Sequence, residues 1–387
     1  KIQDNSTTGL SFNLPYFIAI AENKDITLSP RFFAKDKFLI QSELRQKNKN
    51  SNHEIDFSHY ISSGENSKNH FFYNFNKDYE NENFDEIELN IKLEQVSDET
   101  YLKAYKIESP IINNTSNLTN SLELSLYDEN ISFSSNLDIY EDLSKLDSDK
   151  YEYVPNFSFS KVLNENKMFS SKGYYKNYNT NITEKVLINN FEFNSTAKFL
   201  SNGVINENKL LIKNVNSIET NSNKFKNKAS LSLMPPIQAN YLFPLTKETN
   251  KLNKTLTPKL SLKLSTPHTK DIRKTDRKIN YNNVYDLNRL GIDESNEGGV
   301  SLTYGYEYVV KKKSNSEAKM KFGLANNLRL DDNEDLPSNS NLGDKISDFV
   351  GIFNYKPNRN FKFGYDFSLK NNLSDKNYEP VSYTHLR

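Results

Sequence analysis

The stretch FKFGYDFSLK, residues 361–370, alternates strictly in polarity. Its apolar or aromatic residues occupy every second position: Phe361, Phe363, Tyr365, Phe367 and Leu369. Successive side chains of a β-strand point to opposite faces, so this pattern predicts a strand with one apolar face and one polar face. The fold therefore depends on what covers each of the two faces.

The same alternation recurs along the chain, in IELNIKL (87–93), LTPKLSLKL (256–264) and VSLTYGYEY (300–308). Helical periodicity is hard to find. The pattern predicts roughly 17–18 strands of about 9–12 residues, which is longer than the ~5–6 residues typical of soluble sheets.

The connections between these strands alternate in length. Short turns are expected at 128–130, 164–166, 311–316 and 356–360, and long loops at 141–151, 266–298 and 331–346. Outer-membrane barrels keep short turns at one rim and long loops at the other, and their lipid-facing apolar band is about 25 Å tall.

The sequence therefore predicts an all-β fold, an antiparallel up-and-down outer-membrane β-barrel that is incomplete. The apolar face would contact lipid and the polar face would line a wet lumen. Side chains expected to point outward are Tyr304, Tyr306, Phe363, Tyr365 and Phe367; those expected inward are Glu307, Lys362 and Asp366. The alternative is a soluble β protein of several sheets, such as a surface adhesin or a solenoid.

Composition narrows the function. Lys+Arg and Asp+Glu both number 50 among 387 residues, so no overall charge attracts nucleic acid. Cysteine is absent, which excludes disulfides and thiolate sites. A phosphate-binding glycine loop, a nucleophile elbow and a zinc-binding histidine pair are also absent from the sequence. We therefore predict no catalytic residue, cofactor or metal, and a protein that is not an enzyme.

Several segments resemble the family of LPS-assembly protein LptD, also called organic solvent tolerance protein. The segments, in family order, are TTGLSFNLPYFIAIAENKDITLSPRFFAKDKFLIQSELR, VSDETYLKAY, VYDLNRLGIDESNEGGVSLTYGYEY and LPSNSNLGDKISDFVGIFNYKP. The positions that carry the resemblance are Gly9, Pro15, Tyr16, Asp25, Thr27, Pro30, Glu43, Arg45, Ser97, Asp98, Asn288, Arg289, Gly291, Asp293, Glu297, Tyr304, Gly305, Ser347, Asp348 and Gly351.

The resemblance implies a barrel in the cell outer membrane that takes lipopolysaccharide from a periplasmic LptA-like bridge. Such a protein releases the lipid into the outer leaflet through a lateral gate between its first and last strands. The resemblance also implies an LptE-like lipoprotein that plugs the lumen, and contact with outer-membrane lipid.

The chain departs from the family pattern. The periplasmic jelly-roll domain, expected before Lys1, and the terminal strands are missing, so residues 1–379 are interpreted as a fragment of the barrel domain. Residues 380–387, PVSYTHLR, do not continue the alternation and are interpreted as an uncertain, artefactual tail.

Four residues are candidates for the transport path. Pro15 lies inside a predicted strand, where it removes a hydrogen-bond donor and would weaken the gate; the alternative is an ordinary edge or bulge proline, or one near a strand end. Arg31, Glu43 and Arg45 share the polar parity of their strands. They would face the lumen and contact phosphorylated lipid A sugars or the plug, or else form a structural charge network.

The loop 266–298 is basic early and acidic late, and a loop of this length usually has a function. It could fold over the barrel mouth and hold the plug or guide the saccharide, or remain a solvated loop. The acidic segment 331–335 lacks the spacing of a calcium loop and is interpreted as solvated.

Other functions remain open at this point. Barrel physics does not separate a lipid exporter from a porin or a substrate-specific channel, and only the ordered family segments favour the exporter. A barrel enzyme would need a Ser/His or Thr-based constellation at the lipid-facing rim, which the scattered histidines do not provide.

Overall fold

The computed structural model describes residues 2–3, 8–33, 37–64, 66–145, 147–179, 181–222, 224–267, 269–314, 318–357, 361–372 and 376–386. The chain divides into two compact units. Unit 1 comprises Lys1–Val162, Ser170–Leu187 and Asn216–Leu231; unit 2 comprises Leu163–Phe169, Ile188–Val215 and Ser232–Arg387. The long strands β11, β12, β13 and β15 contribute residues to both units.

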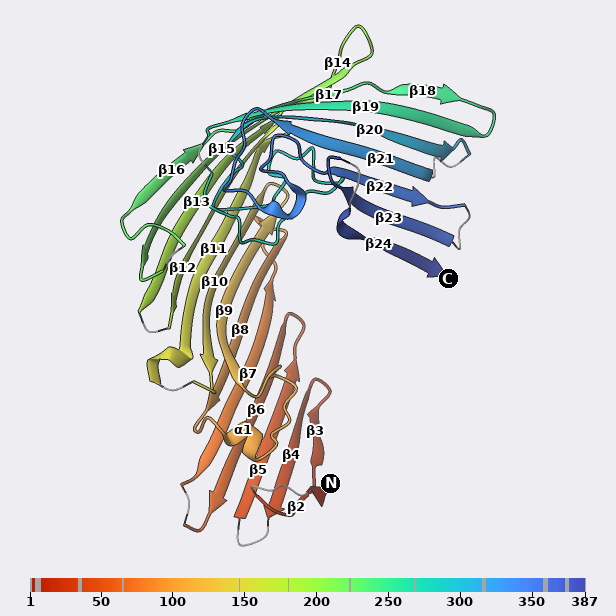
Figure 1. The fold of residues 1–387 in the computed structure, drawn as a ribbon. Helices are drawn as coiled ribbons and strands as arrows, with labels where there is room; N and C mark the ends of the chain where they lie inside the picture. The colour runs from red at the N-terminus through yellow and green to blue at the C-terminus, as the bar shows by residue number, and fades with distance from the viewer. Residues whose placement is uncertain are drawn as a thin grey trace. The chain divides into compact units, whose positions relative to one another are not determined.

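The first part of the chain forms short and then long strands (Figure 1). They are β1 (Ile2–Gln3), β2 (Ser11–Asn13), β3 (Tyr16–Ala21), β4 (Lys24–Phe33), β5 (Lys37–Lys47), β6 (Ser51–Ser62), β7 (Lys68–Tyr79), β8 (Glu86–Val96), β9 (Asn117–Asp128), β10 (Ile131–Asp142), β11 (Tyr151–Asn164), β12 (Lys167–Tyr178) and β13 (Ile182–Asn194). The helix α1 (Tyr101–Ala104) and the 3-10 turn η1 (Asp147–Lys150) lie in connecting loops.

The second part continues the pattern. Its elements are β14 (Lys198–Phe199), β15 (Ile205–Thr220), β16 (Ser230–Met234), β17 (Ile237–Leu242), β18 (Leu245–Glu248), β19 (Leu252–Ser265), β20 (Gly299–Lys312), β21 (Ala318–Arg329), η2 (Ser338–Ser340), β22 (Phe349–Tyr355), β23 (Phe361–Leu369) and β24 (Lys376–Leu386).

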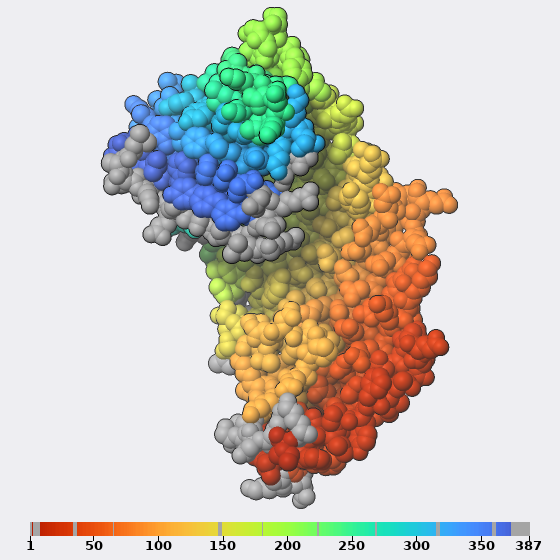
Figure 2. All heavy atoms as spheres, turned by 90° about the vertical axis from the view of Figure 1, so that its right-hand side faces the viewer, coloured from red at the N-terminus to blue at the C-terminus, as the bar shows by residue number. Residues whose placement is uncertain are grey.

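The strands are paired as an antiparallel meander. In unit 1 each strand from β4 to β11 pairs with the next strand along the chain. In unit 2 the same holds from β19 to β24. In Figure 2 the surface accordingly runs in sequence order from red to orange in unit 1 and from cyan to blue in unit 2. The predicted fold class, an antiparallel up-and-down sheet of the outer-membrane barrel type, is confirmed.

The number of strands differs from the prediction. The structure has 24 strand segments among the described residues, whereas the sequence pattern predicts roughly 17–18 strands. Proline accounts for three of the interruptions, since it cannot donate to a ladder. Pro15 separates β2 from β3, Pro235 and Pro236 separate β16 from β17, and Pro244 separates β17 from β18.

The sheet has two distinct faces in each unit. We call the side that carries buried loops the loop face and the other side the apolar face. In unit 2 the side chains of Val350 and Ile352 lie on the loop face, in a buried cluster. A side chain at Gly351 would instead overlap the Phe367 ring, which places Phe367 on the apolar face. The predicted alternation of FKFGYDFSLK is therefore confirmed at this residue.

The apolar face is exposed in both units. Large exposed side chains on it include, in unit 1, Phe32, Phe57, Ile61, Leu122 and Leu137, and in unit 2, Leu256, Leu260, Leu262, Tyr304 and Tyr306. A soluble sheet would cover such a band, because exposing apolar area to water costs about 25 cal/mol per Å².

Within each unit the rim topology agrees with the prediction, and the turns expected at 311–316 and 356–360 lie partly outside the described residues. Antiparallel pairing places the turn before β10 at one end of unit 1 and loop 141–151 at the other end. In unit 2 loops 266–298 and 331–346 share one end of the meander. No helix among the described residues is long and apolar enough to cross a membrane.

The last strand continues past the predicted boundary at 379. β24 extends to Leu386 and pairs with β23 at positions such as Phe361 with Leu386 and Tyr365 with Ser382. Residues 380–386 thus form strand in the structure, although their sequence does not continue the alternation.

Candidate functional site

The first candidate site is the interrupted strand at the N-terminal end of the meander. β2 and β3 both pair with β4, in one continuous register that places Asn13 opposite Arg31 and Tyr16 opposite Leu28. Pro15 lies between the two strands, so the prediction that it sits inside a strand is wrong. The strand is interrupted there because residue 15 is a proline and Leu14 lies opposite another proline, Pro30.

Two prolines remove hydrogen bonds on two different sides of this strand. The backbone N–H of Leu14 donates to the Pro30 carbonyl oxygen at 3.1 Å, which makes Leu14 and Pro30 a hydrogen-bonded pair. Pro30 has no N–H to donate in return, so the pair keeps one bond instead of two. Hydrogen-bonded pairs alternate along an antiparallel ladder, and the missing N–H of Pro15 therefore faces away from β4.

The predicted edge position of residues 10–20 is only partly correct. β1 pairs with β2 through Ile2 with Phe12 and Gln3 with Ser11, so β2 has partners on both sides at these positions. β3 pairs with β4. All six residues of β3 are exposed, including Phe17 at 63% and Ile20 at 53%.

The predicted lumen residues lie together on the loop face, but they differ in environment. Arg31 is buried, and its Nη1 donates to the Tyr105 carbonyl oxygen at 2.5 Å. Arg45 is about half exposed; its Nε donates to Asp25 Oδ1 at 2.9 Å, and it lies 3.6 Å from Glu43. The alternative of a structural charge network therefore fits Glu43 and Arg45, whereas Arg31 is bonded to a backbone carbonyl oxygen.

A loop covers the loop face of unit 1. Residues 97–116 connect β8 to β9, and their buried side chains pack on the sheet. The cluster consists of Tyr101, Leu102, Tyr105, Ile107 and Ile111 from the loop and Leu39, Tyr60, Phe72, Leu118 and Leu143 from the rest of the unit. The loop is fixed at its start, because Ser97 Oγ accepts the Asn69 N–H at 2.8 Å and Asp98 pairs with Lys68 at 3.1 Å.

A buried polar relay lies beneath α1. The Tyr101 hydroxyl is 2.7 Å from Ser58 Oγ, and Ser58 Oγ is 2.6 Å from His70 Nδ1. On the other side of the ring, His70 Nε2 lies 3.2 Å from Asp56 Oδ1, in an alignment too poor for a hydrogen bond. Gln41 ties Asp56 to the loop, since its amide donates to Asp56 and to the Glu108 carbonyl oxygen.

The relay has the residue types of a hydrolytic triad but no access for a substrate. Ser58, His70, Asp56 and Tyr101 are all 0% exposed. Burial raises the pKa of the Tyr101 hydroxyl to about 12, so it stays protonated and can donate to Ser58. The arrangement is that of an anchor for α1. No local sequence pattern predicts this relay, because its members come from three separate segments and only the Tyr of VSDETY lies in a recognisable motif.

The loop face of unit 2 carries a charged anchor. The Glu297 carboxylate receives two bonds of 2.6 Å from Arg289, a further bond from Arg329 Nη1, and a contact of 3.2 Å from Lys263 Nζ. All four side chains are less than 7% exposed. Burial alone would raise the pKa of Glu297, but the charges of Arg289 and Lys263 and the Arg289 hydrogen bonds hold it well below its usual range.

Further bonds hold the same loop on the sheet. Lys213 on β15 is buried, and its ammonium donates to the carbonyl oxygens of Ile292, Asp293 and Ser295 at 2.9–3.2 Å. Gly291 takes a positive φ of 60° where its N–H donates to the Asn288 carbonyl oxygen, a conformation that favours glycine.

Two strand glycines receive aromatic rings from this loop. A side chain at Gly323 would overlap the ring of Tyr281, and one at Gly305 would overlap the Tyr285 hydroxyl. The Tyr281 ring also lies under the ammonium groups of Lys259 and Lys321, which both pair with Glu307. Burial and the Glu307 charge raise the pKa of Tyr281, so its hydroxyl stays neutral.

The second long loop of unit 2 has its own anchors. Ser347 Oγ accepts the Asn327 N–H at 3.0 Å. The Asp348 carboxylate accepts from Asn341 at 2.8 Å, and the Ser368 hydroxyl lies 3.4 Å from it. Ser347 and Asp348 are both 0% exposed, so these motif positions fix the end of the loop to β21 and β23.

Loops 266–298 and 331–346 pack together. Their shared cluster comprises Ile272, Ile279, Tyr281, Val284, Leu290, Leu336 and Leu342, on Ala325, Val350 and Ile352 of the sheet. The interpretation of 266–298 as a solvated loop is wrong for the residues of this buried cluster. It holds only at exposed positions such as Arg273. The acidic segment also takes part, because the Asp335 carbonyl oxygen accepts the Ile272 N–H at 2.9 Å.

Comparison with known proteins identifies the family. Residues 66–383, more than half of the chain, match the family LptD, LPS transport system D. The chain belongs to this family. Five motif positions lie at bonds or turns that hold these loops: Ser97, Arg289, Gly291, Glu297 and Ser347.

One curated relative is LPS-assembly protein LptD from Pseudoalteromonas atlantica (strain T6c / ATCC BAA-1087), 24% identical over 165 residues. The match covers 42% of this chain and 21% of the relative, so the chain spans well under two thirds of that LptD protein. A solved structure, the alcaligin outer membrane receptor FauA from Bordetella pertussis, aligns over 97% of this chain and 68% of its own, with a TM-score of 0.26 and 7% identity.

Proposed function

We propose that this LptD chain forms barrel wall in the outer membrane and delivers lipopolysaccharide to the outer leaflet through a lateral gate. The gate lies at β2 and β3. The observation that carries the proposal is the weakened ladder at Pro15 and Pro30, in a chain that belongs to an LPS transport family.

The two prolines lower the cost of opening without abolishing the sheet. Each missing backbone bond forfeits about 0.5–1.5 kcal/mol. Pro30 removes one bond between β2 and β4, and Pro15 removes a donor on the side where a closing strand would pair. Separating β3 from a closing strand on its outer side therefore costs less free energy than separating two of the long strands that follow.

The faces fit this role. The apolar face would contact membrane lipid, and the loop face would line the lumen, where buried loops and an LptE-like plug lipoprotein restrict the path. An LptA-like periplasmic bridge would supply the lipid. The exposed Phe17 lies on the loop side of β3, next to Thr27 on β4, where a passing acyl chain would meet an aromatic surface.

The test is site-specific photocrosslinking of lipopolysaccharide to residues of β3 in the full-length protein. Pro15→Ala restores the outward donor and should reduce crosslinking and slow export, while heat-modifiable folding stays normal. Pro258→Ala is the matched control, because Pro258 lies within β19, opposite Tyr306 of β20 on one side, and accepts the Phe243 N–H on the other. Unchanged crosslinking and export in Pro15→Ala would contradict the gate.

The same measurement separates the exporter from a porin or substrate-specific channel. A channel would conduct small solutes in a planar bilayer and show no crosslink between lipopolysaccharide and β3. In that case the family assignment would stand, but the gate would not be the route.

A further inference from the structure

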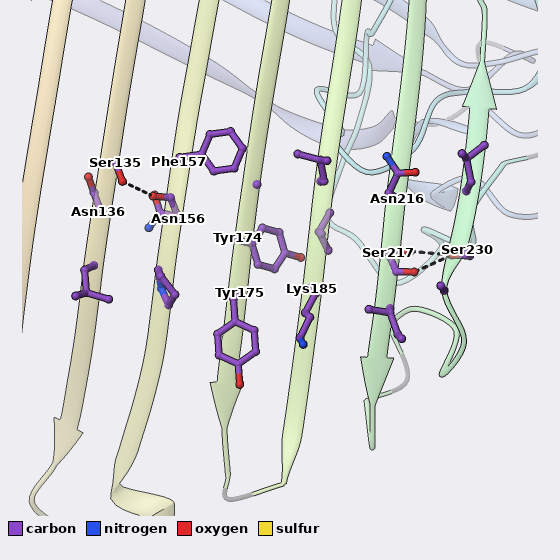
Figure 3. A pocket seen from close by; sticks show the side chains of 18 residues that line it. Ser135, Asn136, Asn156, Phe157, Tyr174, Tyr175, Lys185, Asn216, Ser217 and Ser230 are labelled. Carbon is purple, nitrogen blue, oxygen red and sulfur yellow. Dashed lines mark hydrogen bonds between the residues drawn. The ribbon is translucent and has the colours of Figure 1, made fainter.

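A groove lies on the apolar face of unit 1. It has a volume of about 720 Å³ and crosses β10, β11, β12, β13, β15 and β16 (Figure 3). Its lining includes alternate residues that share one face of a strand, such as Ser135 with Leu137 and Lys185 with Leu187. The walls are formed by Leu137, Phe157, Leu187, Ile218 and Leu231.

The groove depends on a glycine. A side chain at Gly173 would overlap the ring of Phe157, so the ring lies flat against the sheet at this point. Ser135, which pairs with Phe157, and Ala229 keep the neighbouring floor low. Larger residues at these positions would fill the space with protein.

One end of the groove is basic. The Lys185 ammonium lies 5.6 Å from the centre of the Tyr175 ring, and both side chains stand beside the turn that joins β12 to β13 (Figure 3). The loop 221–229 adjoins the same turn, since Asn221 donates to the Asn181 carbonyl oxygen at 3.1 Å. It carries the exposed Lys226 and Lys228, whereas Lys224 pairs with the buried Glu184 and donates to the Tyr174 hydroxyl.

This end belongs to the rim of the long loops. The turn between β12 and β13 lies at the same end of the meander as loop 141–151, one strand length from the short turn before β12. In outer-membrane barrels the longer loops face the outside, where the outer leaflet lies. The basic end is thus at the depth of lipid headgroups, and the apolar walls are at the depth of acyl chains.

We propose that this groove binds one lipopolysaccharide molecule of the outer leaflet from outside the wall, at a site separate from the gate. An acyl chain lies along the walls, and a lipid A phosphate contacts Lys185 and the exposed Lys226 and Lys228. Several cations at one end suit a lipid with more than one phosphate better than a phospholipid with one. The inference rests on the proposed outer-membrane location but not on the gate.

Unit 2 supplies a natural comparison. A smaller groove of about 370 Å³ on its apolar face is lined by Phe243, Pro258, Leu260, Tyr304, Tyr306, Leu324 and Phe349. The one cation at its edge, Lys259, points to the loop face and pairs with Glu307. This second groove can hold an acyl chain but offers no outward cation for a phosphate.

The experiment uses the full-length protein in phospholipid nanodiscs supplied with purified lipopolysaccharide, and native mass spectrometry counts the bound molecules. Ser135→Phe fills the groove and should abolish the retained lipopolysaccharide. Its control is Ser42→Phe, the same change on the apolar face of β5, between Leu28 and Phe57. Lys185→Gln should weaken retention about tenfold, as loss of one charge-assisted phosphate contact implies.

A second control tests charge alone. Lys77→Gln removes the lysine of another outward cation and ring pair, since Lys77 lies 4.3 Å from the Tyr79 ring near the opposite rim and outside the groove. Retention should not change. Equal loss in Ser42→Phe or Lys77→Gln, or equal retention of phospholipid alone, would overturn the proposal.

The outcome for the groove is distinguishable from that for the gate. Pro15→Ala alters crosslinking at β3 and should leave groove retention unchanged. Ser135→Phe alters retention and should leave crosslinking at β3 in place. If lipopolysaccharide is retained by every variant at the same level, the groove is not a site, whatever the result at the gate.

Discussion

The two loop clusters hold long loops on a sheet face through different chemical groups. In each unit, long loops without strand periodicity bury apolar side chains on a sheet face. Unit 1 holds its loop through hydroxyl, imidazole and amide groups around Ser58 and His70. Unit 2 holds its loops through Glu297 and three cations.

The difference shows how strictly each anchor fixes its loop. A buried carboxylate loses its hydrating water and is stable only if cations and hydrogen-bond donors take the place of that water. The charged anchor therefore admits one arrangement of the loop. A chain of hydroxyl and imidazole groups costs less to bury and less to break. We infer that loop 266–298 is the more rigid loop, and that loop 97–116 opens more readily.

The largest expected effect is on the charged anchor. Glu297→Gln leaves Arg289, Arg329 and Lys263 buried without a counter-charge. Removing one partner of a buried pair costs about 3–5 kcal/mol, and hydrogen exchange of loop 266–298 should show local opening increased accordingly. The control is Glu248→Gln, whose pair with Lys313 is exposed and should change opening little. Equal protection in both variants would contradict the comparison.

The charged anchor should also resist acid. The pKa of Glu297 is lowered in the folded state, so its contribution is complete above the unfolded value of about 4.3 and is lost as pH falls through the folded value. Protease sensitivity of loop 266–298 in wild type should rise only well below pH ~4. In Glu297→Gln this acid-induced step should be absent.

The next largest effect is expected at the strand glycines of unit 2 that receive aromatic rings. In Gly323→Ala the new methyl group meets the Tyr281 ring, and such overpacking costs about 1–3 kcal/mol. The measurement is hydrogen exchange around residue 281. Gly364→Ala is the control, since a side chain there meets only the amide end of Asn354. Similar protection in the two variants would show that the ring has room to move.

The relay of unit 1 should be weaker than the charged anchor. Tyr101→Phe removes the hydroxyl that contacts Ser58 and leaves a buried polar group without its partner, at a cost of about 1–3 kcal/mol. Hydrogen exchange of loop 97–116 reports the change. Tyr127→Phe, at an exposed position, should stay within about 0.5 kcal/mol. A larger effect for Tyr101→Phe than for Glu297→Gln would reverse the ranking.

The smallest effect is expected at Arg45. Its pair with Asp25 is about half exposed, and such pairs contribute about 0–1 kcal/mol. Arg45→Gln should therefore leave the unfolding midpoint in detergent almost unchanged. A drop as large as that of Glu297→Gln would mean that the predicted lumen residues are anchors of the same kind.

The sequence by itself determined the strands, their two faces and the order of short turns and long loops, because these follow from local alternation and turn residues. It also identified Arg289, Glu297, Ser347 and Asp348 through the family resemblance, but not their roles. Only the tertiary structure decided that Glu297 meets Lys263 and Arg329, that Tyr101 meets Ser58 and His70, and that Gly323 receives Tyr281. These contacts join residues far apart in the chain, and no local pattern encodes which loop side chain fits which position of a sheet. The same holds for Pro15: its residue type showed a missing donor, but the register with Pro30 decided which side of the strand is weakened.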